Sequence, residues 1–548
     1  MADLTLGPML RYASDTEATV WLETDRRCEV EILGHRASTF HVAGHHYAIV
    51  TITGLQPASS TEYEVWLDDK QRWPPTPSSF PASRIRTLNR DGPLELVFGS
   101  CRVTAPNEPP YTLSPDEHEL GFGIDALHAL ALRMRDQNPE TWPHMLLLLG
   151  DQVYADEVSP ETVEFIRAQR DVHEPPGEEV ADFEEYTQLY REAWSQPPLR
   201  WLLSTIPTAM IFDDHDVHDD WNTSEAWIEQ MRARPWWHER ITAALSSYWI
   251  YQHLGNLTPA ELQNDPFLHQ VMEANDAAPL LRAFAADAER EGGGSLWSFS
   301  RDLAGTRLVV LDGREGRVLS GGRREMLDER EWSWVEQQLT GEFDHVLIAN
   351  TLPVLLAPTL HYLEAWSEAV CNGAWGKLPI PLGERLRQAL DLEHWAAFEG
   401  SFRRLIELVR DLGAGRHGRA PASVVFLGGD VHQAYLHEVA FRRAAGVRSA
   451  VYQAVCSPFR NPLDRRERTL LTAGRRSRLL SWVVRRLAQA AGVKDPEIRW
   501  RLVQEPTFDN QLATLRLDRR HASLTIERTK PGDESRPQLE TSLDRRLT

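Results

Sequence analysis

Three short groups of acidic and histidine residues, each directly after an apolar run, constrain this chain most. The groups are 150–154 (Gly-Asp-Gln-Val-Tyr), 213–216 (Asp-Asp-His-Asp) and 429–432 (Gly-Asp-Val-His), and the runs before them are MLLLL, PTAMIF and SVVFLG. An ionised carboxylate beside a buried strand is costly unless an opposite charge compensates it. A shared metal cluster is the simplest compensation for three such places, so we expect the groups to meet in space.

The chain has 548 residues and a formal net charge of −21, with the length for two or three domains. This charge argues against broad, nonspecific binding to nucleic acid or to an anionic membrane. A site for phosphate must therefore be locally positive, and bound cations would supply that charge.

Four cysteines, Cys28, Cys101, Cys371 and Cys456, show no CxxC spacing. We interpret them as free thiols in a reducing compartment. The start of the chain has no basic or apolar signal-like region, and no apolar run has the length of a membrane span. We therefore expect a soluble, cytoplasmic protein.

The periodicity of the sequence predicts two kinds of domain. Residues 1–88 alternate apolar and polar positions, as in a small β-sandwich of immunoglobulin or fibronectin type, and 73–93 is a Pro- and Ser-rich linker with a last strand. From residue 94 a strand–helix–strand order begins, which predicts a layered α/β domain over 94–530. We expect the polar tail 531–548 to be disordered.

Two segments have composition of their own. Residues 221–256 are rich in tryptophan, and we favour core aromatics over a lid or pocket wall. Within 463–493 the run RRERTLLTAGRRSRLLSWVVRRL is basic and amphipathic. Here we favour a packed helix with a solvated face over contact with a membrane or an anionic partner.

The first and third groups offer ligands for a metal pair. Asp151 is our choice for a carboxylate that bridges two cations. Tyr154 could reach the same metal as a phenolate, which favours a hard ion such as ferric iron; alone, it would be interpreted as a half-buried loop aromatic. Asp430 and His432 are two residues apart, so an extended segment places both on one side, facing one metal pair.

The second group adds a candidate acid–base residue. We assign Asp214 as a metal ligand, His215 as a proton donor or phosphate contact, and Asp216 as the carboxylate that orients His215. A solvated loop does not explain why the group directly follows a buried strand. A calcium loop of EF-hand type requires a glycine that this group lacks. The His-Asp pair of all-helical hydrolases lies on a helix, whereas this group follows a predicted strand.

Ser100-Cys101-Arg102 ends the first strand of the α/β part. The Cys101 thiolate could bind iron or zinc, and the alternative is a small buried residue. Arg102 could lower the pKa of that thiol or grip the substrate phosphate.

The segments GSCR, LGDQVYAD, FDDHDVHDDW, GGDVHQAYL and VCSPFRNPL together resemble the PhoD-type alkaline phosphatases and phosphodiesterases of the calcineurin-like metallophosphoesterase superfamily. The resemblance extends from about residue 94 to 460 and implies a four-layer αββα core. It implies ferric iron on Cys101, Asp151, Tyr154 and His432, and calcium or another divalent cation on Asp151, Asp214 and Asp430. One departure is Asn350-Thr351, where the superfamily often has a further histidine.

These observations predict a metallophosphatase that hydrolyses phosphomonoesters or phosphodiesters. Two cations would share Asp151 and a bridging water, lower its pKa and polarise the phosphoryl oxygens. His215 would assist the leaving alkoxide, and Arg102 would add positive charge. The partner would be a small phosphate ester, with no specific nucleic-acid binding, and the sequence leaves the oligomeric state open. The alternative is a non-catalytic, metal-stabilised protein whose β-sandwich binds a partner or carbohydrate; the His215–Asp216 pair argues against it.

Overall fold

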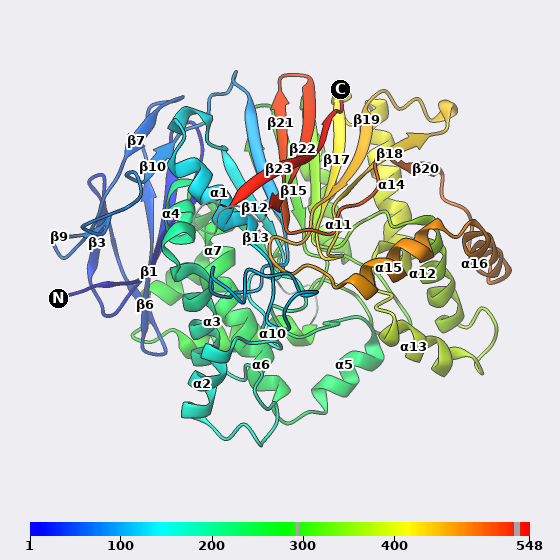
Figure 1. Cartoon of the computed structure of the whole chain (residues 1–548), viewed down its shortest axis with the longest axis horizontal. Coiled ribbons are helices and arrows are strands. Elements are labelled where there is room, and N and C mark those ends of the chain that lie inside the picture. The colour runs from blue at the N-terminus through cyan, green and yellow to red at the C-terminus, as the bar shows by residue number, and fades with distance from the viewer. Residues whose placement is uncertain (292–294, 531–536) are drawn as a thin grey trace.

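The computed structural model of the chain describes residues 1–291, 295–530 and 537–548, without the side chains of 291, 470, 473–476 and 478. Its first part is all-β (Figure 1, blue). Antiparallel strands form two four-stranded sheets, β1-β2-β6-β5 and β4-β3-β8-β9, and a two-stranded pair, β10-β7. Their bounds are β1 Leu4–Ala13, β2 Ala18–Thr24, β3 Glu29–Ile32, β4 His35–Ser38, β5 Phe40–Val42, β6 His45–Ile52, β7 Ser60–Glu62, β8 Val65–Leu67, β9 Lys70–Trp73 and β10 Arg84–Arg86.

Both four-stranded sheets contribute to one apolar cluster. Leu22 and Val50 of the first sheet pack with Val30 and Val65 of the second. An all-β N-terminal part is therefore observed, while its immunoglobulin or fibronectin type and the boundary at residue 88 remain predictions.

Two larger sheets form the centre of the molecule. The first has the order β13-β12-β11-β21-β22-β23, and the second has the order β14-β15-β16-β17-β19-β18-β20. Strands β11, β12 and β13 are parallel to one another, as are β15, β16, β17 and β19. The bounds are β11 Leu94–Gly99, β12 Met145–Leu149, β13 Thr208–Ile211, β14 Phe299–Leu303, β15 Thr306–Leu311, β16 His345–Asn350, β17 Ser423–Gly428, β18 Tyr435–Phe441, β19 Ala450–Val455, β20 Ile498–Leu502, β21 Gln511–Asp518, β22 His521–Lys530 and β23 Gln538–Arg546.

Alternation along these strands explains the layers. Leu96 and Leu147 point into a cluster between the two sheets, together with Leu347 and Leu427 of the second sheet. Their neighbours in the strands point outward to helices, so both faces of each strand are buried, and the strands read as continuous apolar runs. The order helix, sheet, sheet, helix is the four-layer αββα arrangement that the resemblance implies.

Helices cover both outer faces. On the first sheet lie α1 Ala126–Arg135, α3 Phe183–Ser195, α4 Pro197–Thr205 and α6 Trp237–Tyr248, and on the second lie α11 Glu329–Gln338 and α14 Glu399–Ala414. The remaining helices of four residues or more are α2 Pro160–Gln169, α5 Glu225–Arg232, α8 Pro259–Asn264, α9 Pro266–Glu273, α10 Ala278–Glu291, α12 Pro358–Cys371, α13 Ile380–Ala389, α15 Arg465–Arg476 and α16 Arg478–Ala490, with a π-helical turn at Trp249–His253. The tryptophans of the 221–256 segment belong to the core, as predicted: Trp227, Trp237 and Trp249 are buried in the cluster under the first sheet.

The end of the chain differs from the prediction. Residues 538–546 are not a disordered tail but form β23, the edge strand of the first sheet, which pairs with β22. Its sequence QLETSLDRR is polar because an edge strand exposes much of its surface. Residues 531–536 of the predicted tail lie outside the described residues.

The four cysteines are free thiols, as predicted. Among the described residues, no helix is both long and apolar enough to cross a membrane.

Candidate metal centre

The three groups meet where parallel strands of the two sheets end. Asp151 follows β12, Asp213 and Asp214 follow β13, and Asp430 follows β17 of the other sheet. Carboxylate oxygens of these four residues lie within 4.8 Å of one another. The expectation that residues hundreds of positions apart converge is therefore confirmed, and Asp213 joins the set that the sequence indicated.

Two glycines allow this approach. A Cβ on Gly150, whose φ is +95°, would lie 2.5 Å from Cβ of Asp213, and a Cβ on Gly429 would lie 2.3 Å from Oγ of Ser100. The Ser100 hydroxyl also accepts a hydrogen bond of 2.9 Å from the Asp430 amide, which joins the two sheets at the site. Any side chain at these glycines would push the strand ends apart.

The backbone at the site is strained. Cys101, Asp151, Asp430 and His432 have φ values of +53°, +51°, +64° and +47°. Such conformations cost non-glycine residues about 1 kcal/mol or more each and concentrate at functional sites. All four are residues that the sequence predicted as metal ligands.

The carboxylates need a compensating charge. Asp151 is 1% exposed and Asp213 is 0% exposed. Within the described part of the chain, Oδ1 of Asp151 and Oδ2 of Asp213 have no hydrogen-bond partner. Burial raises the pKa of Asp151 well above its usual range, and the neighbouring carboxylate of Asp213 raises it further. Buried carboxylate oxygens that lie close together and receive no hydrogen bond are suited to bind a hard cation.

Ligand types other than carboxylate adjoin this cluster. Sγ of Cys101 lies 3.2 Å from Oδ2 of Asp151. The hydroxyl oxygen of Tyr154 accepts a hydrogen bond of 3.2 Å from Nδ2 of Asn461, so that oxygen can act as an acceptor or ligand. Burial lowers the pKa of His432 to about 4, which keeps its imidazole neutral, as a metal ligand must be. Asn461, in the quoted segment VCSPFRNPL, received no role from the sequence.

His215 has a different carboxylate partner from the predicted one. Its Nδ1 lies 2.9 Å from Oδ1 of Asp156. Asp216 instead accepts hydrogen bonds of 2.9 Å from the backbone amides of Asp151 and Asp213, and so it ties together the loops after β12 and β13. The prediction that Asp216 orients His215 was wrong, because Asp216 turns toward those amides.

The surroundings of His215 also favour its protonated form. Burial alone would lower the pKa of His215, but the hydrogen bond and charge of Asp156, with Asp214 and Asp151, raise it well above its usual range. Its ring packs against Tyr154 at 4.6 Å between centroids. A protonated imidazole with a fixed Nδ1–H can donate a proton through Nε2.

Arg102 does not reach the centre. It is 2% exposed, its Nη2 lies 2.7 Å from Oδ2 of Asp125, and its Nη1 donates to the carbonyl of Ala193 at 3.0 Å. Asp125 caps α1, so Arg102 joins a strand end to two helices. The prediction of a substrate contact was wrong, because a buried carboxylate on the other side holds the guanidinium.

Another arginine, which the sequence reasoning missed, meets the carboxylates. Arg314 follows β15 and is 0% exposed. Its guanidinium pairs with Asp213, lies 3.1 Å from Asp214 and 2.6 Å from Glu393. It compensates part of the negative charge, chiefly at Asp213. The only signal in the sequence was the strand-end segment VVLDGREGR.

A histidine from the segment between β16 and β17 also lies at the site. Nδ1 of His394 lies 2.8 Å from Oε1 of Glu364, and its Nε2 lies 3.4 Å from Oδ2 of Asp430. Asn350, the strand-end residue, is occupied elsewhere: its Oδ1 accepts from the Leu352 amide and from Nε1 of Trp395. The charge and hydrogen bond of His394 help to hold the pKa of Asp430 at about 2 against its burial.

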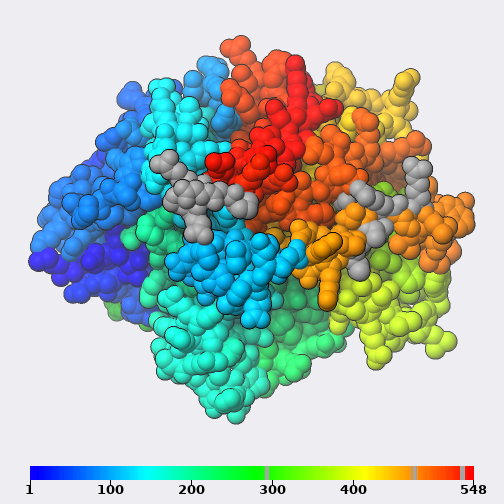
Figure 2. All heavy atoms as spheres, in the orientation of Figure 1, coloured from blue at the N-terminus to red at the C-terminus, as the bar shows by residue number. Residues whose placement is uncertain are grey.

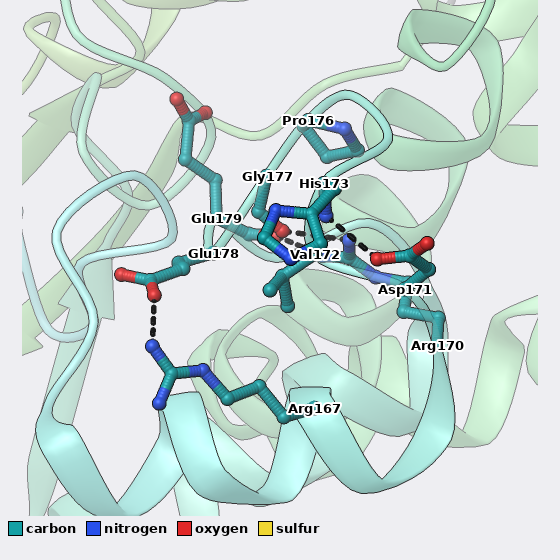
Figure 3. Close-up of a pocket in the computed structure, with 9 residues that line it drawn as sticks. All are labelled: Arg167, Arg170, Asp171, Val172, His173, Pro176, Gly177, Glu178 and Glu179. Atoms are coloured by element: carbon teal, nitrogen blue, oxygen red, sulfur yellow. Dashed lines mark hydrogen bonds and ion pairs between the residues drawn. The ribbon is translucent and has the colours of Figure 1, made fainter.

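Residues that follow Asp151 in the sequence line two surface hollows, and only one of these hollows borders the metal centre. One of about 790 Å³ is formed by Arg167 and the turn 170–179 (Figure 3), and contains none of the metal-centre residues. Its polar groups serve the turn itself: Arg170 donates to the carbonyl of Gly177 at 2.7 Å, and Arg167 pairs with Glu178. The other, of about 690 Å³, is bounded by Tyr154 together with Tyr111 and Phe122. Only the second therefore borders the centre.

Comparison with known proteins gives matches to family models and to solved structures. A family model described as PhoD-like phosphatase matches residues 130–270, and a domain of unknown function (DUF7800) matches residues 1–85. A search of curated proteins found no match. A solved structure titled "Structure of PhoD" is similar at a TM-score of 0.60 and 12% identity, covering 100% of this chain and 92% of that chain. A purple acid phosphatase from yellow lupin (Lupinus luteus) seeds is more distant, at a TM-score of 0.47 and 10% identity, over 97% of this chain and 73% of that one.

Proposed function

We propose that the chain is a PhoD-type phosphatase that hydrolyses phosphate esters with bound metal ions, and that its chemistry takes place between the four-carboxylate cluster and His215. The observation that carries this proposal is the convergence of Asp151, Asp213, Asp214 and Asp430 within 4.8 Å. The non-catalytic alternative is disfavoured because a structural calcium site needs no imidazole.

We assign the ligands to two sites. Cys101, Asp151, Tyr154 and His432 would hold ferric iron, and Asp151, Asp214 and Asp430 would hold calcium or another divalent cation. The neutral state of His432 and the acceptor role of the Tyr154 oxygen support the first site. The low pKa of Asp430, about 2, supports an ionised carboxylate at the second. When bound, the cations would activate a water molecule and polarise the phosphoryl oxygens.

The residues of the chain would complete the reaction. His215, held by Asp156, would donate a proton from Nε2 to the oxygen of the leaving group. Arg314 would hold Asp213 in place without touching the substrate. Asp216 would keep the loops of Asp151 and Asp213 in register through its two amide contacts.

Elemental analysis and turnover together test this function. Purified protein should contain iron, show a violet or brown tyrosinate colour, and hydrolyse p-nitrophenyl phosphate or its bis ester. Asp151→Asn should lose both metal and turnover, because Asp151 belongs to both sites. Asp69→Asn, at a side chain that is 89% exposed in an ion pair with Arg36, is the matched control and should keep both. Full activity with unchanged metal content in Asp151→Asn would refute the assignment.

A further inference from the structure

The outward face of α16 is apolar. Its inward side chains Val484 and Ala488 pack in one cluster with Tyr362 of α12. On the opposite side, Leu479, Trp482, Val483 and Leu487 are 74%, 57%, 38% and 40% exposed. Their spacing of three or four residues aligns them in one stripe, which we call the α16 ridge. The prediction of a packed helix with a solvated face is therefore confirmed for α16, and the solvated face carries apolar side chains.

Exposed apolar side chains continue beside this helix. Nε1 of Trp375, in the turn between α12 and α13, donates to the carbonyl of Ala490 at 3.4 Å. The same turn and α13 carry Leu378 and Leu382, which are 97% and 71% exposed. Figures 1 and 2 show α16 at the right edge of the molecule, next to the α12–α13 hairpin. Clustered exposure of this kind marks an interaction surface, unlike single exposed leucines.

The surface is also basic in an acidic protein. Residues 465–486 contain eight arginines and one glutamate, while the whole chain carries −21. Arg465 and Arg466 are exposed on α15, and the guanidinium of Arg486 lies 5.8 Å from the ring centroid of Trp482. The negative net charge of the chain therefore does not exclude an anionic partner at this surface, because charge is unevenly distributed and salt screens distant charges.

These features select one occupant. A second copy of the chain would bring two arginine-rich helices together across a self-complementary interface, where like charges repel. A bilayer with anionic lipids offers phosphate for the arginines and an apolar boundary for a protruding helix face. We propose that α15 and α16 dock the protein on an anionic lipid bilayer, with the α16 ridge at the headgroup boundary and Arg465, Arg466 and Arg486 on lipid phosphates.

The position of α15 gives this docking a consequence. α15 begins at Arg465, four residues after Asn461, whose side chain contacts Tyr154. Docking would bring this rim of the metal centre close to the membrane surface. The inference does not depend on the proposed chemistry, because it concerns binding alone.

Vesicle flotation with the full-length protein tests the proposal. We expect flotation with vesicles of phosphatidylcholine and phosphatidylglycerol at low salt, and weak flotation with phosphatidylcholine alone. High salt should weaken binding to the mixed vesicles by about tenfold or more, since the arginine contacts are screened. Absence of flotation with mixed vesicles at low salt would overturn the proposal.

Two double variants separate the apolar and the charged contributions. Leu479→Ser with Trp482→Ser should weaken binding to mixed vesicles by about tenfold or more. Arg465→Gln with Arg466→Gln should weaken it by a similar factor and flatten the salt dependence. Leu33→Ser with Trp66→Ser, which are 39% and 37% exposed in the N-terminal part, is the matched control and should bind as the wild type does.

Each variant is first checked for an unchanged thermal unfolding midpoint, since the replaced side chains are exposed. Equal binding by the ridge variant and the wild type would refute the ridge as the docking element. Concentration-dependent dimerisation of the wild type that the ridge variant abolishes, without flotation of either protein, would assign the surface to a second copy instead.

Discussion

At the scale of single residues, the partner of each charged side chain decides its role. His215 and Asp216 are neighbours in sequence, yet His215 binds Asp156 while Asp216 binds two backbone amides. Arg102 and Arg314 both follow strands, yet only Arg314 faces the carboxylate cluster. Residue type and position in the sequence were therefore sufficient to identify candidate site residues. They were not sufficient to assign the role of each residue.

Asp156→Asn tests the assignment of the carboxylate behind His215. The variant removes the charge that stabilises the imidazolium, so we expect kcat to fall by about 10²-fold. The loss should be larger for alkyl phosphates than for p-nitrophenyl phosphate, because poor leaving groups depend more on proton donation. Steady-state kinetics with both substrates measures this, and the exposed neighbour Glu157→Gln is the control. An equal loss for both substrates would contradict a proton-donating role.

At the scale of elements, contacts between distant segments fix the N-terminal all-β part on the α/β part. His45 of β6 lies 2.9 Å from Glu23 of β2 and 2.8 Å from Glu184 of α3. Burial would lower the pKa of His45, but the two carboxylates raise it to about 9. Arg11 of β1 also reaches into the helical layer, where its Nη1 and Nη2 donate to the carbonyls of Tyr251 and Gln252.

The His45 contact predicts a pH dependence of stability. Because its folded pKa lies above the ordinary value of 6.5, the protonated form is stabilised on folding. This contribution, on the order of 2–3 kcal/mol, is fully present below pH 6.5 and is lost as pH rises toward 9. His45→Gln should therefore lower the free energy of unfolding in urea near pH 6 and have little effect near pH 10. The exposed His173→Gln is the control, and an equal loss at both pH values would contradict the prediction.

At the scale of the whole molecule, the metal centre lies where the two sheets meet, and both sheets contribute carboxylates to it. Without cations, burial raises the pKa of Asp213 well above its usual range, as it does for Asp151. Folding the metal-free protein therefore takes up protons, and its stability falls as pH rises above the ordinary pKa of a carboxyl group.

Metal removal should expose this cost. We expect chelation to lower the thermal unfolding midpoint, with a loss of about 3 kcal/mol for each site that held its cation at 100-fold excess over Kd. The midpoint of the chelated protein should fall further as pH rises above the ordinary pKa of a carboxyl group, while that of the loaded protein should change little. Calorimetry with and without chelator measures both, and Asp151→Asn should respond weakly to the chelator. A chelator-independent midpoint in the wild type would count against cations at the metal centre.

The sequence by itself determined the layered α/β architecture, the strand ends that carry the chemistry, and the carboxylates that converge there. These features follow from alternation and from the apolar runs of buried strands, which are local properties of the chain. The tertiary structure alone decided that Asp156 holds His215, that Arg102 turns away, that Arg314 and His394 enter the site, and that residues 538–546 complete a sheet. Each of these depends on which distant segment packs alongside, because a buried charge or an unpaired strand edge takes the partner that the fold brings within reach.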